Sequence, residues 1–206
     1  MDPVEGHRRY RQSLFEMFDS YRNPGGHPVV FVGDSMTEGC DWHEAFGDGL
    51  TIANRGIGGD TTIGVLRRIG EIVAMAPRAV FLMIGLNDCL MLRSKPSQAA
   101  KNYEAIVKGI RTGSPQTAIY LESILPVASF RGEGTNDWIR EMNERIRALA
   151  DGRMVVFVSL YEGFLEGTSL SMRFTDDGVH PNAAGYALWR QEVAPFVRSA
   201  IGDETW

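Results

Sequence analysis

The chain has 206 residues, of which 44% are hydrophobic and 23% charged, and this composition is typical of one globular domain. Its two cysteines, Cys40 and Cys89, are too few for a disulfide-stapled fold, and we expect them to be free thiols. Twenty-one Lys and Arg against 26 Asp and Glu give a net charge of −5, which argues against nucleic acid as a partner.

The pattern of the chain predicts one helix followed by alternating strands and helices. The predicted helices cover residues 8–21, 61–73, 97–111, 138–150 and 182–201, with Ser97 as an N-cap. The predicted strands are short and mostly apolar, and they cover residues 29–32, 50–53, 80–84, 118–121 and 154–158. We therefore expect an α/β protein, a three-layer α/β/α sandwich with a five-stranded parallel sheet. One domain would span residues 1–206, with residues 1–24 as a helical extension packed on it.

Four segments that follow the predicted strands carry side chains with catalytic chemistry. In a parallel sheet such segments meet at one edge, where ligands bind. They are Gly33-Asp34-Ser35-Met36, Gly56-Ile57-Gly58-Gly59-Asp60-Thr61, Gly85-Leu86-Asn87-Asp88 and Asp176-Asp177-Gly178-Val179-His180-Pro181.

Each segment alone has a functional and a structural interpretation. Ser35 is either a nucleophile in a sharp turn or a helix N-cap. The glycine loop either presents an N–H group to an oxyanion or forms a tight turn, and it lacks the lysine of a phosphate-binding loop. Asn87 either donates to an oxyanion or caps a local turn. Asp177 lies three residues before His180, so its carboxylate can orient the ring, although a lone histidine near a helix start is usually structural.

Taken together, and in this order, the four segments resemble the SGNH (or GDSL) hydrolase superfamily, whose four marks are Ser, Gly, Asn and His. The resemblance covers roughly residues 28–200. It is carried by Gly33-Asp34-Ser35, with Met36 where leucine is usual, by Gly59 ahead of Asp60-Thr61, by Gly85-Leu86-Asn87-Asp88 and by Asp177-Gly178-Val179-His180.

The resemblance implies a flavodoxin-like fold and a serine esterase. Ser35 would be the nucleophile, His180 its base and Asp177 the partner of His180. The backbone N–H groups of Ser35 and Gly59 and the side-chain amide of Asn87 would form the oxyanion hole. No cofactor is implied, and four scattered histidines and two cysteines offer no metal-ligand spacing.

The sequence defines the type of reaction more closely than it defines the substrate. The superfamily includes carbohydrate acetylesterases, lysophospholipases, thioesterases and platelet-activating-factor acetylhydrolases, and the loop at residues 54–61 is similar to that of the last group and its bacterial relatives. We expect an ester of a short acyl group, acetyl, on a carbohydrate or other small alcohol, with Trp42, Phe130 and Arg131 contacting it at the mouth of the site. Two alternatives remain: a lysophospholipase or thioesterase of the same family, and a non-catalytic glycan- or phosphate-binding module.

The expected partner is a small-molecule ester, and the sequence leaves open whether the chain forms a homodimer. The longest uncharged apolar stretch, residues 79–86, is too short to span a membrane. The first 20 residues lack the apolar segment of a secretory signal, so the sequence as written predicts a cytoplasmic protein. If a signal has been removed, the protein is periplasmic or secreted.

Overall fold

The computed structural model describes residues 9–10, 12–14, 16–18, 27–46 and 50–202, and its centre is a parallel sheet. The five strands are β1 (Val29–Gly33), β2 (Ile52–Gly56), β3 (Ala79–Met83), β4 (Ala118–Glu122) and β5 (Val155–Val158). They lie in the order β2-β1-β3-β4-β5, and all four neighbouring pairs are parallel. This is the flavodoxin-like order, in which the chain reverses direction across the sheet between β1 and β3. A short hairpin, β6 (Leu165–Glu166) with β7 (Ser169–Leu170), is separate from the sheet.

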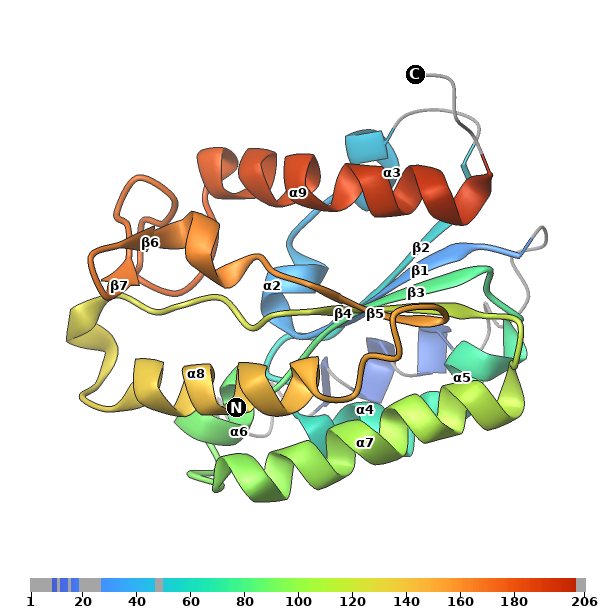
Figure 1. Cartoon of the computed structure of the whole chain (residues 1–206), viewed down its shortest axis with the longest axis horizontal. Helices are drawn as coiled ribbons and strands as arrows, with labels where there is room; N and C mark the ends of the chain where they lie inside the picture. Colours follow the sequence, from blue (N-terminus) through green and yellow to red (C-terminus); the bar gives the residue numbers. More distant parts are fainter. Residues whose placement is uncertain (1–8, 11, 15, 19–26, 47–49, 203–206) are drawn as a thin grey trace.

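Helices cover both faces of the sheet (Figure 1). One face carries α3 (Trp42–Phe46) and α9 (Ala183–Ile201), and the other carries α4 (Thr62–Arg67), α5 (Ile69–Ala74), α7 (Pro96–Gly113) and α8 (Thr135–Arg147). Four short elements follow strands β1, β3, β4 and β5, and they are α2 (Ser35–Glu38), α6 (Leu86–Leu90), η1 (Ser129–Arg131) and η2 (Tyr161–Phe164). The predicted α/β/α sandwich is confirmed, and its carboxyl edge is where these short elements gather.

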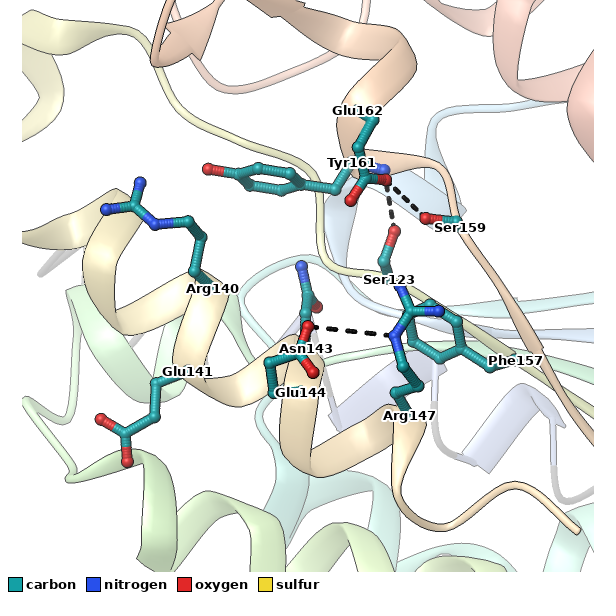
Figure 2. Close-up of a pocket in the computed structure, with 10 residues that line it drawn as sticks. All are labelled: Ser123, Arg140, Glu141, Asn143, Glu144, Arg147, Phe157, Ser159, Tyr161 and Glu162. Atoms are coloured by element: carbon teal, nitrogen blue, oxygen red, sulfur yellow. Dashed lines mark hydrogen bonds and ion pairs between the residues drawn. The ribbon is translucent and has the colours of Figure 1, made fainter.

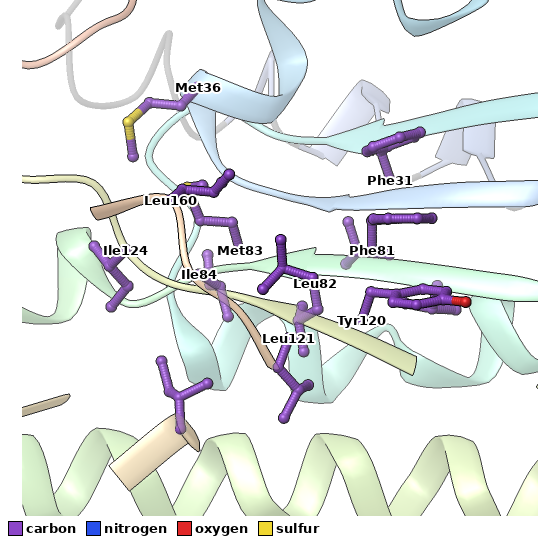
Figure 3. Packing of buried hydrophobic residues seen from close by; sticks show 14 of the residues in the cluster. Phe31, Met36, Phe81, Leu82, Met83, Ile84, Tyr120, Leu121, Ile124 and Leu160 are labelled. Carbon is purple, nitrogen blue, oxygen red and sulfur yellow. The ribbon is translucent and has the colours of Figure 1, made fainter. Parts of the chain in front are cut away.

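An aromatic ladder crosses the core on the face covered by α3 and α9 (Figure 3). Phe31, Phe81 and Tyr120 are register partners on β1, β3 and β4, and their ring centroids are 4.8 and 4.6 Å apart. Trp42 stacks on Phe31 with a centroid distance of 4.0 Å, and Phe196 of α9 packs on Tyr120 at 5.5 Å. Because a register slip would turn these rings to the opposite face, the ladder fixes the height at which each strand ends.

Two helix boundaries differ from the sequence prediction. The helix predicted over residues 61–73 is divided into α4 and α5 at Arg68, whose φ of −108° and ψ of 13° are not helical. Helix α7 begins at Pro96, with Lys95 rather than Ser97 at the N-cap position. Proline is favoured in the first helical turn because it has no backbone N–H, and an N–H there would have no acceptor within the helix. No described side chain caps the start of α7.

Described residues between 9 and 18 are helical and contact the sheet domain. Phe18 is buried, and the guanidinium of Arg55 lies 4.6 Å from the centre of its ring. The hydroxyl of Tyr10 donates to the carboxylate of Glu38 on α2. The remaining residues of the predicted N-terminal extension lie outside the described residues. Among the helices that the structure describes, none is long and apolar enough to cross a membrane.

A buried carboxyl group at the end of β4 makes stability depend on pH. Glu122 is 1% exposed, it accepts a hydrogen bond from the indole N–H of Trp189 at 2.7 Å, and burial raises its pKa to about 8. Because the pKa of Glu122 is higher in the folded state than in the unfolded state, its contribution to stability is fully present below the unfolded-state pKa. This contribution is lost as the pH rises from that value toward 8.

We predict that Glu122→Gln stabilises the protein at pH 7 by on the order of 3 kcal/mol, because the amide cannot ionise. The gain should vanish near pH 4, where Glu122 is protonated in both states. Denaturant unfolding across this pH range measures it, and the exposed Glu104→Gln serves as the control. A stability difference that does not change with pH would contradict the assignment.

Candidate active site

The segment after β1 places Ser35 at the start of a helix. Asp34 is the N-cap, and its side chain accepts the N–H of Met36 at 3.0 Å. Ser35 is therefore not the cap but the first helical residue, whose N–H has no acceptor within the helix. Glycine is required at position 33, two residues before Ser35, because a Cβ there would lie 2.5 Å from the carbonyl oxygen of Met83. The backbone N–H and the hydroxyl of Ser35 both lie at the carboxyl edge of the sheet, at the start of α2.

Ser35 forms a hydrogen-bonded chain with His180 and Asp177. The hydroxyl of Ser35 lies 2.9 Å from Nε2 of His180, although 145 residues separate them. Nδ1 of the same ring lies 2.6 Å from Oδ2 of Asp177. When Nδ1 carries the proton and donates a hydrogen bond to the carboxylate of Asp177, Nε2 is unprotonated and can accept the proton of the serine hydroxyl. The three side chains thus have the arrangement of a nucleophile, a base and an orienting acid.

The carboxylate of Asp177 is held in the ionised state that this arrangement needs. Its Oδ1 accepts the backbone N–H groups of Val179 and His180, each at 2.8 Å. Burial works to raise the pKa of Asp177, but hydrogen bonds from the ring and backbone of His180 and from Val179 outweigh it and hold the pKa well below its usual range. Arg131 donates to the carbonyl oxygen of Asp177 at 2.7 Å and so joins η1 to the segment at residues 176–181, called here the catalytic loop.

In the glycine loop, Gly59 differs from its neighbours in the hydrogen bonding of its backbone N–H. The N–H groups of Gly56, Ile57, Gly58, Asp60 and Thr61 all donate to acceptors that the structure describes. For Gly59, the described part of the chain shows no such acceptor. Its φ of 70° lies in the left-handed region, where glycine is favoured. This geometry fits the oxyanion role that the sequence resemblance implies for Gly59.

The amide of Asn87 reaches from the β3 segment toward the other two. Its Nδ2 donates to the carbonyl oxygen of Asp60 at 2.9 Å and lies 3.4 Å from Oδ2 of Asp34. The position before α6 is occupied by Gly85 without a side-chain cap, so the side chain of Asn87 does not cap its own turn. Burial raises the pKa of Asp34 to about 7. Asn87 therefore lies where the segments after β1, β2 and β3 converge.

Buried polar contacts fix these segments to one another. Asp88 accepts both the backbone N–H and the hydroxyl of Thr62, at 2.8 and 2.6 Å, and so joins α6 to the start of α4. Sequence reasoning treated Asp88 only as part of a motif and assigned no role to Arg68, which is also buried at this edge. Charged residues are expected in water, so the sequence contained no signal for their burial.

The three predicted substrate contacts have different surroundings. Trp42 is 1% exposed, stacks on Phe31 and donates its indole N–H to the carbonyl oxygen of Thr37, so its prediction as a substrate contact is wrong. Its large apolar surface is better buried against the aromatic ladder than exposed at the mouth. Phe130 is 65% exposed on η1, and Arg131 is on the same turn. These two lie beside the catalytic loop.

Neither cysteine forms a disulfide, as predicted. Cys40 and Cys89 are both half-buried free thiols. Burial raises the pKa of Cys40 to about 12 and also raises that of Cys89, so neither is a reactive thiolate at neutral pH. Among the described residues, no group of three or more His, Cys, Asp and Glu side chains could hold a metal ion.

Figure 2 shows a cavity of about 290 Å³ that is separate from this site. Its lining residues come from α8, β5 and η2 and from the segments after β4 and β5, and they include Ser123, Arg147, Phe157 and Tyr161 but no member of the Ser35–His180–Asp177 chain. The candidate site is therefore identified by its chemistry rather than by the size of a cavity.

Comparisons with known proteins show the family of the chain. Residues 31–188 match the model of the GDSL-like lipase/acylhydrolase family. The chain belongs to this family. Among curated relatives of this acylhydrolase is platelet-activating factor acetylhydrolase IB subunit alpha2 of Rattus norvegicus, 32% identical over 171 residues that cover 77% of this chain and 71% of the relative. The predicted superfamily is thereby confirmed, and the protein is an ester hydrolase.

Solved structures share the fold of the acylhydrolase. A Streptococcus pneumonia protein named for platelet activating factor is 27% identical, with a TM-score of 0.85 over 94% of this chain and 95% of that one. A GDSL-like lipase of Bacteroides thetaiotaomicron is 24% identical, with a TM-score of 0.78 over 90% and 98%. The second likeness shows the fold alone.

The neighbouring residues Asp176 and Asp177 allow a matched test of which carboxylate orients His180. Asp177 contacts the ring of His180, whereas the contact described for Asp176 is a 3.4 Å hydrogen bond that it accepts from Asn182. We predict that Asp177→Asn lowers kcat at least about 10²-fold, because the amide favours the wrong tautomer of the ring. Asp176→Asn should change kcat little. Steady-state kinetics of both variants decide the matter, and the opposite ranking would show that the orienting acid is misassigned.

Proposed function

We propose that the acylhydrolase is a serine esterase that cleaves short acyl esters, acetyl above all, from a carbohydrate or other small alcohol. The observation that carries the proposal is the 2.9 Å contact between the Ser35 hydroxyl and Nε2 of His180, whose Nδ1 is held by Asp177. A serine hydroxyl is a weak nucleophile unless a positioned base removes its proton.

In the first half of the reaction, Oγ of Ser35 bonds to the ester carbonyl carbon while Nε2 of His180 takes the hydroxyl proton. The carbonyl π electrons move to oxygen, and the N–H groups of Ser35 and Gly59 and the amide of Asn87 stabilise that oxyanion. When the carbon–oxygen double bond re-forms, the bond to the alcohol breaks, and His180 delivers its proton to the leaving alkoxide. Alcohol leaves, and an acyl-Ser35 ester remains.

In the second half, His180 removes a proton from water, and the resulting hydroxide adds to the acyl carbon. The oxyanion forms again in the same position, and its collapse breaks the bond to Oγ of Ser35. The proton held on Nε2 returns to Oγ, so serine is restored and the carboxylic acid departs. Asp177 stabilises the imidazolium in both halves.

The acyl group and the alcohol are inferred from different observations. The relative's name, an acetylhydrolase, supports acetyl as the acyl group. For the alcohol, the exposed ring of Phe130 borders a hollow of about 220 Å³ that Leu170 and Met172 also line. A Cβ on Gly178 would lie 2.5 Å from that ring, so Phe130 packs directly on the catalytic loop. An aromatic face at this place can pack against the apolar face of a sugar ring.

Turnover of p-nitrophenyl acetate, butyrate and octanoate tests the proposal. We expect kcat/KM to fall steeply from acetate to octanoate, and acetate to be released from a fully acetylated xylose. Highest activity on octanoate would favour a lysophospholipase or thioesterase instead. No turnover of any ester would favour a non-catalytic binding module, and Ser35→Ala provides the background rate.

A further inference from the structure

Arg68 lies inside the molecule at the break between α4 and α5. Its side chain is 0% exposed. The side chains of its two carboxylate partners are also buried, with 1% of Asp60 and 3% of Glu71 exposed. Burying a guanidinium costs free energy of folding unless its donors have acceptors. Replacing a buried ion pair by apolar residues of similar volume often leaves folding stability unchanged or increases it. A role in stability alone therefore does not account for an arginine at this position.

The contacts of Arg68 reach three segments that converge on the site. Its Nε donates to Oδ2 of Asp60 at 3.0 Å. One terminal nitrogen donates to the carbonyl oxygen of Arg55 at 2.8 Å and to that of Gly33 at 3.4 Å. The other terminal nitrogen donates to Glu71 at 3.2 Å. Gly33 ends β1 two residues before Ser35, and Arg55 lies in β2 just before the glycine loop.

Asp60 connects this arginine to the oxyanion donors. It directly follows Gly59 in the chain, so fixing its side chain restricts where the N–H of Gly59 points. Its carbonyl oxygen also accepts the amide of Asn87 at 2.9 Å. The carbonyl oxygen of Gly33, which Arg68 contacts, accepts the N–H of Ile57 at 3.1 Å and so holds the start of the same loop.

We propose that Arg68 is a positioning residue that builds the oxyanion hole: through Asp60 it sets the N–H of Gly59 and the amide of Asn87 relative to Ser35. The inference rests on the proposed serine esterase mechanism. The planar guanidinium of Arg68 donates from three nitrogens to two carboxylates and two carbonyl groups, whereas a lysine has three N–H donors on a single nitrogen. Misplacing catalytic groups by about 1 Å from a distance can cost around 10²-fold in rate.

Three variants of the whole chain test this role with p-nitrophenyl acetate. Arg68→Met removes all the contacts, and Arg68→Lys keeps the charge but not the fork. Glu71→Gln is the matched control, because Glu71 accepts from the terminal nitrogen of Arg68 other than the one that donates to Gly33 and Arg55, and Asp60 is bound through Nε. Each variant is measured for kcat, KM, Tm and the inhibition constant of a trifluoromethyl ketone, which adds to the serine and forms a tetrahedral oxyanion.

We expect Arg68→Met to lower kcat about 10²-fold with little change in KM, and Arg68→Lys to fall between it and wild type. Inhibition by the ketone should weaken by the same factor as kcat/KM, whereas Glu71→Gln should lose Tm but keep kcat and ketone affinity. If Arg68→Met does not fold, Arg68→Lys decides alone. Wild-type ketone affinity in the folded Arg68 variants, or losses in Glu71→Gln as large as theirs, would overturn the proposal. An inactive wild type would instead refute the esterase.

Discussion

Ser35→Ala should abolish ester hydrolysis, with kcat/KM on p-nitrophenyl acetate reduced at least about 10⁴-fold. Removing the hydroxyl removes the atom that forms the acyl-enzyme, and only binding and the oxyanion donors would then favour reaction. The half-exposed environment of Ser35 means that the loss of one oxygen costs little stability. The Tm should therefore remain within a few degrees of the wild-type value.

A second serine provides the matched control for this variant. Ser159 lines the separate cavity of Figure 2 and donates to Glu162 there. Ser159→Ala should keep wild-type turnover, because no step of the proposed reaction takes place in that cavity. Equal losses in the two variants would indicate a general effect on folding, and a loss in Ser159→Ala alone would move the site to that cavity.

Asn87→Ala should lower kcat by about 10²–10³-fold, equivalent to roughly 3–4 kcal/mol of transition-state stabilisation. In the proposed mechanism the amide donates where negative charge develops, so its loss should affect the transition state more than the bound ester. KM should accordingly change little. Folding stability should fall by only about 1 kcal/mol, from the loss of the hydrogen bond between Nδ2 of Asn87 and the carbonyl oxygen of Asp60.

Asn143 gives the opposite pattern and serves as the control. Its buried amide accepts the N–H of Ile124 at 2.8 Å and donates to the carbonyl oxygen of the same residue at 3.0 Å. Asn143→Ala should therefore lower Tm and leave kcat nearly unchanged in the protein that remains folded. If Asn87→Ala behaved like Asn143→Ala, Asn87 would be structural, and the oxyanion hole would consist of the Ser35 and Gly59 amides alone.

Sequence reasoning predicted the sheet well because its strands are continuously apolar. The segments around Phe31 and Phe81 have no other stable environment than a sheet covered on both faces, and this forces the following segments to one edge. That is why Ser35 and His180, 145 residues apart, could be expected to meet. The short helices α2 and α6 and the β6–β7 hairpin were not predicted, because elements of two to five residues have no periodicity to detect.

The remaining errors concern side chains whose environment depends on distant segments. Trp42 was expected at the mouth of the site, but its ring packs on Phe31 and on Trp189 of α9. The helix predicted over residues 61–73 was continuous in its apolar pattern, but it is divided at Arg68, whose side chain makes buried contacts with distant segments. Neither outcome is encoded in local sequence, because the partners come from elements that only the folded chain brings together.

Covalent labelling tests the central claim most directly. The acylhydrolase is incubated with a fluorophosphonate, and its intact mass and peptide map are measured. We predict one adduct per chain, located on Ser35, absent from Ser35→Ala and much slower to form in a variant that lacks His180. An adduct on another residue, or labelling of Ser35→Ala at the wild-type rate, would contradict the account.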